Sequence, residues 1–417
     1  MLVVVLRKHH EHTEKLLKTT FWWSRPPKRI TFGDYNHQKM IKRQIEAAFT
    51  ENLLAENHKM LLLLGPRQTG KTTLVRKVAT QFTGKSLYLS GDDPTVRSRL
   101  TNVGIESLRP LLEANDLLIL DEAQRILNIG ITLKLMTDHF PNTRVIATGS
   151  SSFALSNQIN EPLTGRRTEF HLFPVCWQEW VDHIGLHAAE SGLEQRLLYG
   201  MYPEVLNRPG EEKEVLAGLA SDNLYRDLLS FAPIRKPEIL VQLLQALALQ
   251  MGSEVSFNEL SNLLKVDKQT VANYITALEQ AYVIFRLGPL SRNLRNEIST
   301  TRKIYFYDNG IRNALIGNFA ELSLRQDKGA LWENFMISER VKRNSYARRH
   351  FVNSYFWRTK QGQEIDYLEE SDGHISAFEI KWNPKSQAKL PKSFESAYPQ
   401  HDFSVLSPAN FGKFLKI

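Results

Sequence analysis

One octapeptide of this sequence has the residue types and spacing of a phosphate-binding loop. Residues 65–72 read GPRQTGKT, which matches G-x-x-x-x-G-K-[ST] at every constrained position. The apolar run Met60–Leu64 precedes it and a helical pattern follows, so backbone N–H groups would surround phosphate oxygens at a helix N-terminus. We expect Lys71 to contact the β and γ phosphates of a nucleoside triphosphate and the hydroxyl of Thr72 to bind Mg²⁺. The predicted nucleotide-binding residues are Gly65, Pro66, Arg67, Gln68, Thr69, Gly70, Lys71, Thr72, Thr73 and Asp121.

Two adjacent carboxylates are the second group of residues that could take part in a reaction. Asp121 and Glu122 follow the apolar run Leu117–Leu120, and the carboxyl end of a buried strand is where an open α/β sheet places its functional groups. We expect Asp121 to hold the Mg²⁺ shell, and Glu122 to polarise the water that attacks the γ-phosphate. This pair predicts hydrolysis of ATP in addition to binding.

Two further candidates leave alternatives open. Ser150 follows the apolar run Arg144–Thr148, where a hydroxyl can orient the attacking water, although a simple turn is the other interpretation. Arg166 could neutralise transition-state charge, in its own chain or from a neighbouring subunit, or form a structural salt bridge. The predicted catalytic residues of the ATPase are therefore Lys71, Glu122, Ser150 and Arg166.

The C-terminal part contains a second set of charged residues with regular spacing. The Asp-Gly pair at 372–373 is favoured in two-residue hairpin turns. It predicts a register in which Asp366 lies opposite Glu379, and Glu364 opposite Lys381. Alternation then puts these four side chains on one face of the hairpin. The other face is predicted to contain Ile365, Tyr367, Phe378 and Ile380.

Opposed carboxylates repel one another unless a cation lies between them. We expect Asp366 and Glu379, with Glu333 from an upstream helix, to bind a divalent metal ion, and Lys381 to help generate or steady a hydroxide. This is the D…(D/E)-x-K pattern of metal-dependent nucleases, although a solvated hairpin face is the alternative. Nearby cations that could follow a phosphate backbone are Arg340, Lys342, Arg343, Arg348, Arg349, Arg358 and Lys360.

A helix-turn-helix is predicted between these two regions. Ser256 would cap a short first helix, Lys265–Asp267 would form the turn, and Lys268–Leu278 would form the second helix. A strand-like segment, Tyr282–Leu287, would begin a wing. The buried positions of the second helix would be Val271, Ile275 and Leu278, and the basic residues of the wing Arg292, Arg295 and Arg302. The residues that would meet the DNA major groove are Lys268, Gln269, Asn273 and Thr276; a packing or protein-contact role is the other interpretation.

The elements that must position these groups follow from the hydrophobic pattern. Apolar strands alternate with helical stretches, which predicts an α/β fold with a mostly parallel sheet covered on both faces. These strands are expected at 60–64, 86–90, 116–120 and 144–148. The predicted parts are a basic N-terminal extension at 1–44, a P-loop ATPase domain at 45–180, a helical, winged-helix-like region at 181–300 and an α/β nuclease-like domain at 301–417.

Composition limits the remaining classes of protein. A net charge of +8 and a pI of about 9.3 favour an acidic partner, nucleic acid first, although charge alone is weak support. Cys176 is the only cysteine, which excludes an internal disulfide and cysteine-rich zinc sites. No apolar run approaches the ~20 residues that cross a membrane, and the N-terminal apolar stretch is too short for a signal peptide. We expect a cytoplasmic protein without a membrane partner.

Several stretches together resemble one family of proteins. They are Gly65–Thr73 (GPRQTGKTT), Leu117–Gln124 (LLILDEAQ), Ala147–Ser151 (ATGSS), Leu163–Arg166 (LTGR) and Tyr199–Leu206 (YGMYPEVL). They are similar to the AAA+-type ATPases of bacteria and archaea that carry a C-terminal domain of unknown function. From about Ile45 onward, the resemblance implies an AAA+-like domain, a winged-helix-like middle and a C-terminal domain of restriction-endonuclease-like fold. AAA+-like ATPases often complete their sites across subunits, which leaves a homo-oligomer or a protein partner open.

Three functions are consistent with these patterns. The first is an ATP-hydrolysing enzyme acting on DNA, in which the nucleotide state positions or gates a metal-dependent nuclease module. The second is a regulatory ATPase switch whose C-terminal domain is an inactive scaffold that binds protein partners. The third is a DNA-binding regulator whose occupancy ATP controls.

Overall fold

The computed structural model describes residues 40–150, 163–223, 237–291 and 302–416. Every described helix and strand belongs to one compact unit, Lys42–Ile417. Most of the basic extension predicted at 1–44 lies outside the described residues, as do Arg292 and Arg295 of the predicted wing.

The first sheet is parallel throughout, as the alternation of strand and helix patterns predicts. Its five strands lie in the order β2-β3-β4-β1-β5, so β1, the strand before the phosphate loop, lies between β4 and β5. Their bounds are β1 Met60–Leu64, β2 Ser86–Ser90, β3 Leu117–Asp121, β4 Arg144–Gly149 and β5 Arg167–His171. β1 and β3 are buried at every residue, which is typical of a parallel sheet covered on both faces. The sequence pattern did not predict β5, because Phe170 is its only apolar residue.

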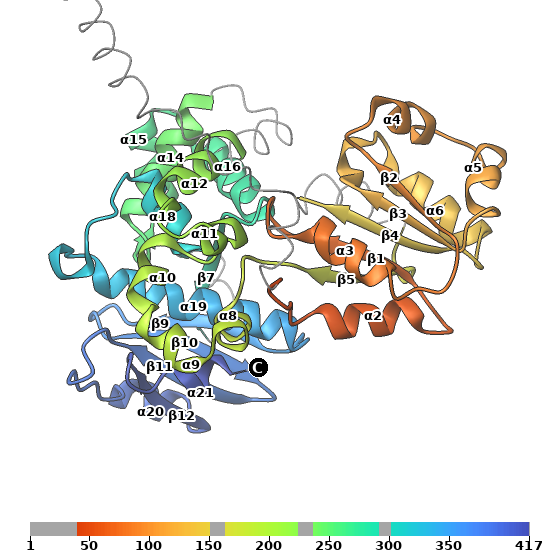
Figure 1. Cartoon of the computed structure of the whole chain (residues 1–417). Coiled ribbons are helices and arrows are strands. Elements are labelled where there is room, and N and C mark those ends of the chain that lie inside the picture. The colour runs from red at the N-terminus through yellow and green to blue at the C-terminus, as the bar shows by residue number, and fades with distance from the viewer. Residues whose placement is uncertain (1–39, 151–162, 224–236, 292–301, 417) are drawn as a thin grey trace, which may run out of the picture. The chain divides into compact units, whose positions relative to one another are not determined.

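Helices cover both faces of this sheet (Figure 1). Leu61 and Leu63 of β1 pack in the core with α2 and α3, whereas Met60, Leu62 and Leu64 pack in the core with α4, α5 and α6, because successive side chains of a strand point to opposite faces. The helices are α2 Glu46–Leu54, α3 Lys71–Ala79, α4 Pro94–Leu100, α5 Ile105–Leu112 and α6 Ile129–His139.

The middle of the chain is mainly helical, as the sequence predicts. Its first helices are α8 Trp177–Ile184, α9 Leu186–Ser191, α10 Leu193–Tyr199, α11 Pro203–Asn207 and α12 Glu212–Gly218, and after a gap in the described residues come α14 Pro237–Leu249, α15 Phe257–Leu264 and α16 Lys268–Gln280. The side chain of Ser256 accepts a hydrogen bond from the backbone of Glu259 at the start of α15, and Asp267 does the same for Thr270 at the start of α16. The cap predicted at Ser256 is therefore confirmed.

A second sheet contains strands from both sides of residue 300. Its strand order is β12-β11-β10-β9-β7-β8-β6. The bounds are β6 Glu254–Val255, β7 Ile284–Pro289, β8 Arg302–Phe306, β9 Asn353–Arg358, β10 Glu364–Ser371, β11 His374–Ile380 and β12 His401–Leu406. β8 pairs antiparallel with β6 and β7, and β7 pairs in parallel with β9. The predicted boundary at residue 300 therefore falls between two strands that pair with each other.

One hydrophobic core joins the middle of the chain to its C-terminal part. It includes Leu240 of α14 and Ile275 of α16 together with Tyr367 of β10 and Trp332, which lies in α19 (Lys328–Tyr346). The C-terminal helices are α18 Asn309–Leu315, α19 Lys328–Tyr346, α20 Lys392–Ala397 and α21 Gly412–Leu415. Among the described residues, no helix combines the length and apolarity needed to cross a membrane.

The predicted hairpin forms, but a bulge changes one of its faces. β10 and β11 pair from Ser371 opposite His374 to Tyr367 opposite Phe378, in the predicted register. Against β9, however, the register shifts between Ile365 and Leu368. Ile365 therefore packs with α20 in a separate small core, and Tyr367 packs in the main core. The prediction that Ile365 shares a face with Tyr367, Phe378 and Ile380 is wrong, because a bulge puts an extra residue into the alternation.

Candidate functional site

The phosphate loop lies between β1 and α3, where its glycines are required by geometry. Gly65 has φ of 150°, and a Cβ added there would lie 2.1 Å from the carbonyl oxygen of Leu172. This close approach arises because the Leu172 amide donates to the Leu64 carbonyl. Gly70 has φ of 92° and precedes the first turn of α3. A side chain at either position would distort the loop.

Side chains from inside and outside the loop hold its backbone. The Lys71 ammonium donates to the carbonyls of Gly65 and Pro66 at 2.8 and 2.7 Å. The Arg43 guanidinium donates to the carbonyl of Thr69 at 2.6 Å and pairs with buried Glu179 at 3.1 Å. Burial alone would lower the pKa of Arg43, but the charge of Glu179, the nearby Tyr346 and the hydrogen bond to Glu179 together raise it. Sequence reasoning missed Arg43, because it lies in a segment without a recognisable motif.

Asp121 is the point on which the site converges. Its carboxylate accepts hydrogen bonds from Thr72 of the loop at 2.7 Å, from Tyr88 of β2 at 2.6 Å, and from Thr148 of β4. Burial would raise the pKa of Asp121, but the hydrogen bonds from Thr148, Tyr88 and Thr72 lower it. Burial and the bond to Asp121 raise the pKa of Tyr88 to about 12. Asp121 is therefore an anion next to the hydroxyl of Thr72, and the two supply the oxygen ligands that Mg²⁺ prefers.

Glu122 and Ser150 are joined by a residue that the sequence analysis did not single out. The amide nitrogen of Gln124 donates to Glu122 at 2.6 Å and to the Ser150 hydroxyl at 2.9 Å. Its amide oxygen is buried and has no hydrogen-bond partner among the described residues. Glu122 has φ of 51°, a left-handed conformation that is uncommon outside glycine. A Cβ added to Gly91 would lie 2.3 Å from the carbonyl oxygen of Glu122. Gln124 follows the carboxylate pair by two positions, a spacing that could have indicated it.

Arg166 lies in an ion pair within its own chain. Its guanidinium is 2.5 Å from the carboxylate of Asp138, and its side chain is 40% exposed. This is the structural salt bridge that one interpretation of the sequence expected. A role for Arg166 in neutralising transition-state charge stays a prediction.

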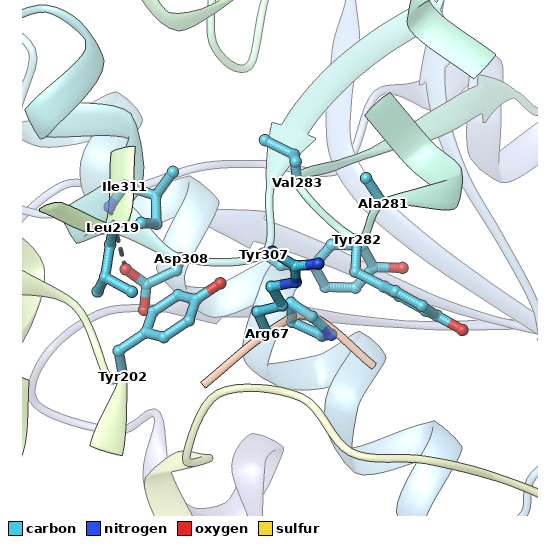
Figure 2. Close-up of a pocket in the computed structure, with 10 residues that line it drawn as sticks. Arg67, Tyr202, Leu219, Ala281, Tyr282, Val283, Tyr307, Asp308 and Ile311 are labelled. Carbon is cyan, nitrogen blue, oxygen red and sulfur yellow. Dashed lines mark hydrogen bonds between the residues drawn. The ribbon is translucent and has the colours of Figure 1, made fainter. Parts of the chain in front are cut away.

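A small cavity adjoins the phosphate loop (Figure 2). It is lined by Pro66 and Arg67 of the loop, by residues from the middle of the chain such as Tyr202, and by Tyr307 and Asp308 of the C-terminal part. Its volume of about 30 Å³ is enough for about two water molecules, so it is too small for a ligand. The carboxylate of Asp308 accepts the amide hydrogens of Met201 and Ile311 at 2.7 and 3.1 Å, and burial raises its pKa. The phosphate loop therefore lies next to the middle of the chain across this cavity.

The charged residues predicted around the C-terminal hairpin do gather in one place. We call Lys303, Glu333, Glu364, Asp366, Glu379 and Lys381 the acid–lysine cluster. Lys381 lies 2.6 Å from Glu379 and 3.5 Å from Asp366. Lys303 lies 2.5 Å from Glu364 and 3.5 Å from Glu333. The amide of Ile380 donates to Asp366 at 2.8 Å. Sequence reasoning missed Lys303, because it comes from a strand distant in sequence.

The cluster contains more negative than positive charge. Burial raises the pKa of Glu333 to about 7, against the lowering effect of Lys303. Burial and the charge of Asp366 raise the pKa of Glu379. In the part of the chain that the structure describes, no three carboxylate, histidine or cysteine side chains are grouped as metal ligands; the carboxylates here are paired with lysines.

Two of the cations expected to follow a phosphate backbone are buried instead. Arg340 forms hydrogen bonds of 2.8 and 2.6 Å with Glu369. Lys342 lies 2.7 Å from Glu339, and both side chains are 2% exposed or less. The prediction that these two could contact phosphate is wrong, because α19 is buried on more than one side and these residues face its packed neighbours. Arg358 is half exposed and pairs with Glu254 at 3.2 Å.

The helix-turn-helix buries the side that the sequence predicts. Val271, Ile275 and Leu278 are buried. Lys268, Gln269 and Asn273 are exposed, and Gln269 donates to Asn273 at 2.9 Å. β6, β8 and β7, which follow one another at one edge of the seven-stranded sheet, pair antiparallel. The exposed side chains of α16 are therefore available for contact.

Comparisons with known proteins assign one part of the chain clearly. Residues 57–181 match a model described as an AAA domain, and residues 190–322 and 328–410 match two domains of unknown function, DUF8612 and DUF4143. An uncharacterized protein of Mycobacterium tuberculosis is 29% identical over 393 residues, which cover 90% of this chain and 83% of that protein. An uncharacterized protein of Methanocaldococcus jannaschii is 26% identical over 357 residues, covering 79% and 75%.

Among solved structures, a Walker-type ATPase of Pyrococcus abyssi covers 67% of this chain and 97% of its own, with a TM-score of 0.47 and 18% identity. The AAA-domain match contains the phosphate loop, Asp121 and Glu122. The chain is therefore an ATPase with an AAA-type P-loop domain, in agreement with the prediction from its motifs.

Proposed function

We propose that this ATPase acts on DNA and that its nucleotide state controls a metal-dependent nuclease module in the C-terminal part. The observation that carries the proposal is the acid–lysine cluster. It brings Glu333, Asp366, Glu379 and Lys381 together beside a bulge, and bulges are common next to active sites.

In the ATPase site, each residue has a defined task. The loop amides and Lys71 bind the phosphates. Thr72 and Asp121 would hold Mg²⁺, which supplies charge neutralisation on the β and γ phosphates. Glu122 accepts a proton from the attacking water. Gln124 holds Glu122 and Ser150 at a fixed separation through its two hydrogen bonds.

In the C-terminal site, carboxylate oxygens are the ligands that a divalent ion prefers, although Glu333, Asp366 and Glu379 are paired with lysines here and are not grouped as ligands. Asp366, Glu379 and Glu333 would hold the ion, which supplies an activated water for attack on a phosphodiester. The raised pKa of Glu333 and of Glu379 reflects excess negative charge in a buried setting, which a divalent cation would relieve. Lys381 lies within reach of both hairpin carboxylates, so it can steady the hydroxide.

Helix α19 offers a physical connection between the two sites. It carries Glu333 in the acid–lysine cluster, and Tyr346 at its far end accepts a hydrogen bond from the Phe173 amide at 3.1 Å. Tyr346 is also 3.4 Å from Arg43, which holds the loop carbonyl of Thr69. The thirteen residue steps from Glu333 to Tyr346 span about 20 Å of rigid helix. A displacement of the phosphate loop can therefore be transmitted along α19.

The test separates hydrolysis of ATP from cleavage of DNA. Plasmid nicking is measured with Mg²⁺ or Mn²⁺, with and without ATP, for the wild type, Asp366→Asn and Lys381→Ala, and ATP turnover is measured alongside. We expect both variants to lose nicking and to keep ATP turnover. Lys71→Ala should lose ATP turnover. Nicking that survives in Asp366→Asn would rule out the proposed metal site.

A regulatory switch with an inactive C-terminal scaffold is the second candidate. The pairing of every cluster carboxylate with a lysine favours it, because such pairs also occur in structural networks. Absence of nicking by a wild type that hydrolyses ATP under all these conditions would select this second function.

A further inference from the structure

The turn between α19 and β9 is basic and carries an exposed aromatic ring. We call Arg348, Arg349, His350 and Phe351 the basic turn. All four residues are exposed, and Phe351 is 87% exposed, more than any other large hydrophobic residue in the part of the chain that is described. Arg348 has φ of 52°, a left-handed conformation that costs free energy in a residue with a side chain. Packing among the described residues does not account for the exposed ring of Phe351.

The basic turn borders a cleft. The walls of the cleft come from the start of α2, from β5 and from the end of α19, and its volume is about 380 Å³. This volume lies in the range of small-molecule sites, so the cleft has room for one nucleotide unit. The guanidinium of Arg348 lies 4.6 Å from the centre of the Phe170 ring, which leaves its edge available to an anion. His171, Arg349 and His350 also line the cleft.

The charge at this end of α19 favours an anion. Burial lowers the pKa of Arg343, and the positive charges of Arg340 and Arg349 lower it further. The nearby acids are already engaged with cations. Glu169 lies 3.2 Å from Arg167 and 3.1 Å from His171, and Glu369 lies 2.6 Å from Arg340 and 3.6 Å from Arg349.

We infer that the basic turn and its cleft bind single-stranded polynucleotide. Phe351 stacks on a base, and Arg348 and Arg349 contact the adjoining phosphodiesters. Exposed aromatic rings combined with cations are the usual means of binding single strands, because every base has a face that can stack. In a duplex the bases are already stacked on one another and are not accessible to Phe351. The inference rests on the proposed action on DNA and names the form of substrate that is held.

Strand β9 connects the basic turn to the acid–lysine cluster. β9 begins at Asn353, two residues after Phe351, and ends at Arg358, which lies 3.9 Å from Glu364 of the cluster. Five residue steps along a strand cover about 17 Å, which corresponds to about five stacked nucleotide steps. A single-stranded polynucleotide held at the basic turn can therefore extend to the acid–lysine cluster.

The experiment measures binding without the metal site. Fluorescence anisotropy is recorded for the full chain with labelled oligo(dT) and oligo(U) of roughly 15 nucleotides, in EDTA and at low salt. The two oligomers distinguish DNA from RNA as the source of the single strand. We expect Phe351→Ala to weaken binding about 5- to 150-fold, the loss that removal of one base–aromatic stack produces. Phe351→Leu should weaken binding similarly, and Phe351→Trp should preserve it.

Matched variants test the two parts of the site separately. Arg348→Gln should weaken binding and reduce the slope of log K against log salt by about 0.7, the value for one lost contact to single-strand phosphate. Leu324→Ala and Arg99→Gln replace an exposed apolar residue and an exposed arginine elsewhere and should leave affinity unchanged. Thermal melting of each variant confirms that it is folded.

The outcomes are distinguishable from those of the proposed function. Wild-type affinity in Phe351→Ala overturns the inference, even if the chain still nicks DNA and hydrolyses ATP. Binding of duplex alone, insensitive to Phe351, also overturns it. A change of molar mass in Phe351→Ala by light scattering, without a change in affinity, identifies this surface as a contact with protein and overturns it too. Loss of nicking in Asp366→Asn with intact binding of single strands supports both.

Discussion

Asp121 illustrates at the residue scale why short motifs predict this ATPase site so well. The carboxylate lies at the end of a buried strand, and the hydroxyl of Thr72 reaches it from a loop whose shape the glycines impose. Each of the two residues belongs to a short motif of its own, so the motifs were sufficient. Arg43 was missed because it lies in a segment without a recognisable motif, and Lys303 because its partner Glu364 comes from a strand far away in the chain.

Gln124 gives a first test at this scale. Gln124→Ala removes the amide that joins Glu122 to Ser150, so the attacking water and its base should be less well oriented. We expect kcat for ATP hydrolysis to fall about tenfold or more, with little change in KM, in steady-state kinetics. Gln81→Ala, at an exposed position, is the control. An unchanged kcat in Gln124→Ala would remove Gln124 from the site.

Glu333 gives a second test, through pH. Its pKa is about 7 in the folded chain and ordinary in the unfolded chain, so folding favours the protonated acid. Stability from this group is fully present below about pH 4.5 and is lost as pH rises to about 7, by at most about 3 kcal/mol. Glu333→Gln mimics the protonated acid and lacks this dependence.

Urea unfolding in EDTA checks this expectation. The free energy of unfolding of Glu333→Gln minus that of the wild type should be larger at about pH 8 than at about pH 5. A difference that is constant with pH would show that the carboxyl of Glu333 titrates normally.

At the scale of elements, the sequence pattern predicts the structure correctly where the pattern depends on that helix or strand alone. The caps of α15 and the buried side of α16 are of this kind. The bulge in β10 could not be predicted in this way. It is defined by the pairing of β10 with β9, and no feature of the β10 sequence alone indicates it. α19 is similar: Arg340 and Lys342 look like solvent-facing cations in sequence, but elements from several parts of the chain enclose them.

The end of α19 supplies the prediction for this scale. Tyr346→Phe removes the oxygen that accepts the Phe173 amide, and a buried donor without a partner costs about 1–3 kcal/mol. We expect the free energy of unfolding to fall by about this amount in urea titration. Tyr274 is also buried, and no hydrogen bond of its hydroxyl is described. Tyr274→Phe should therefore have a smaller effect. Equal effects of the two changes would contradict the anchoring of α19 by Tyr346.

At the scale of the whole molecule, the sequence predicts the order of the regions along the chain better than the boundaries between them. The structure contains a parallel sheet with its helices, then a mainly helical region, then a mixed α/β region. The positions of these regions were estimated from changes in composition and pattern. Composition cannot show that β7 and β9 pair in parallel, because parallel pairing joins residues that are distant in sequence.

The shared seven-stranded sheet has a consequence for how the chain unfolds. The helices before residue 290 and the strands after residue 350 contribute to one main core. The C-terminal part adds only a small core of its own around Ile365, so most of the apolar side chains of both parts are buried together. We expect them to melt together in a single calorimetric transition. A fragment that ends at residue 300 would expose the edge of β7 and should aggregate. If that fragment proves monomeric and folded, the two parts are independent. Otherwise the smallest piece of this protein that can be purified intact with this core is the whole assembly from α8 to α21.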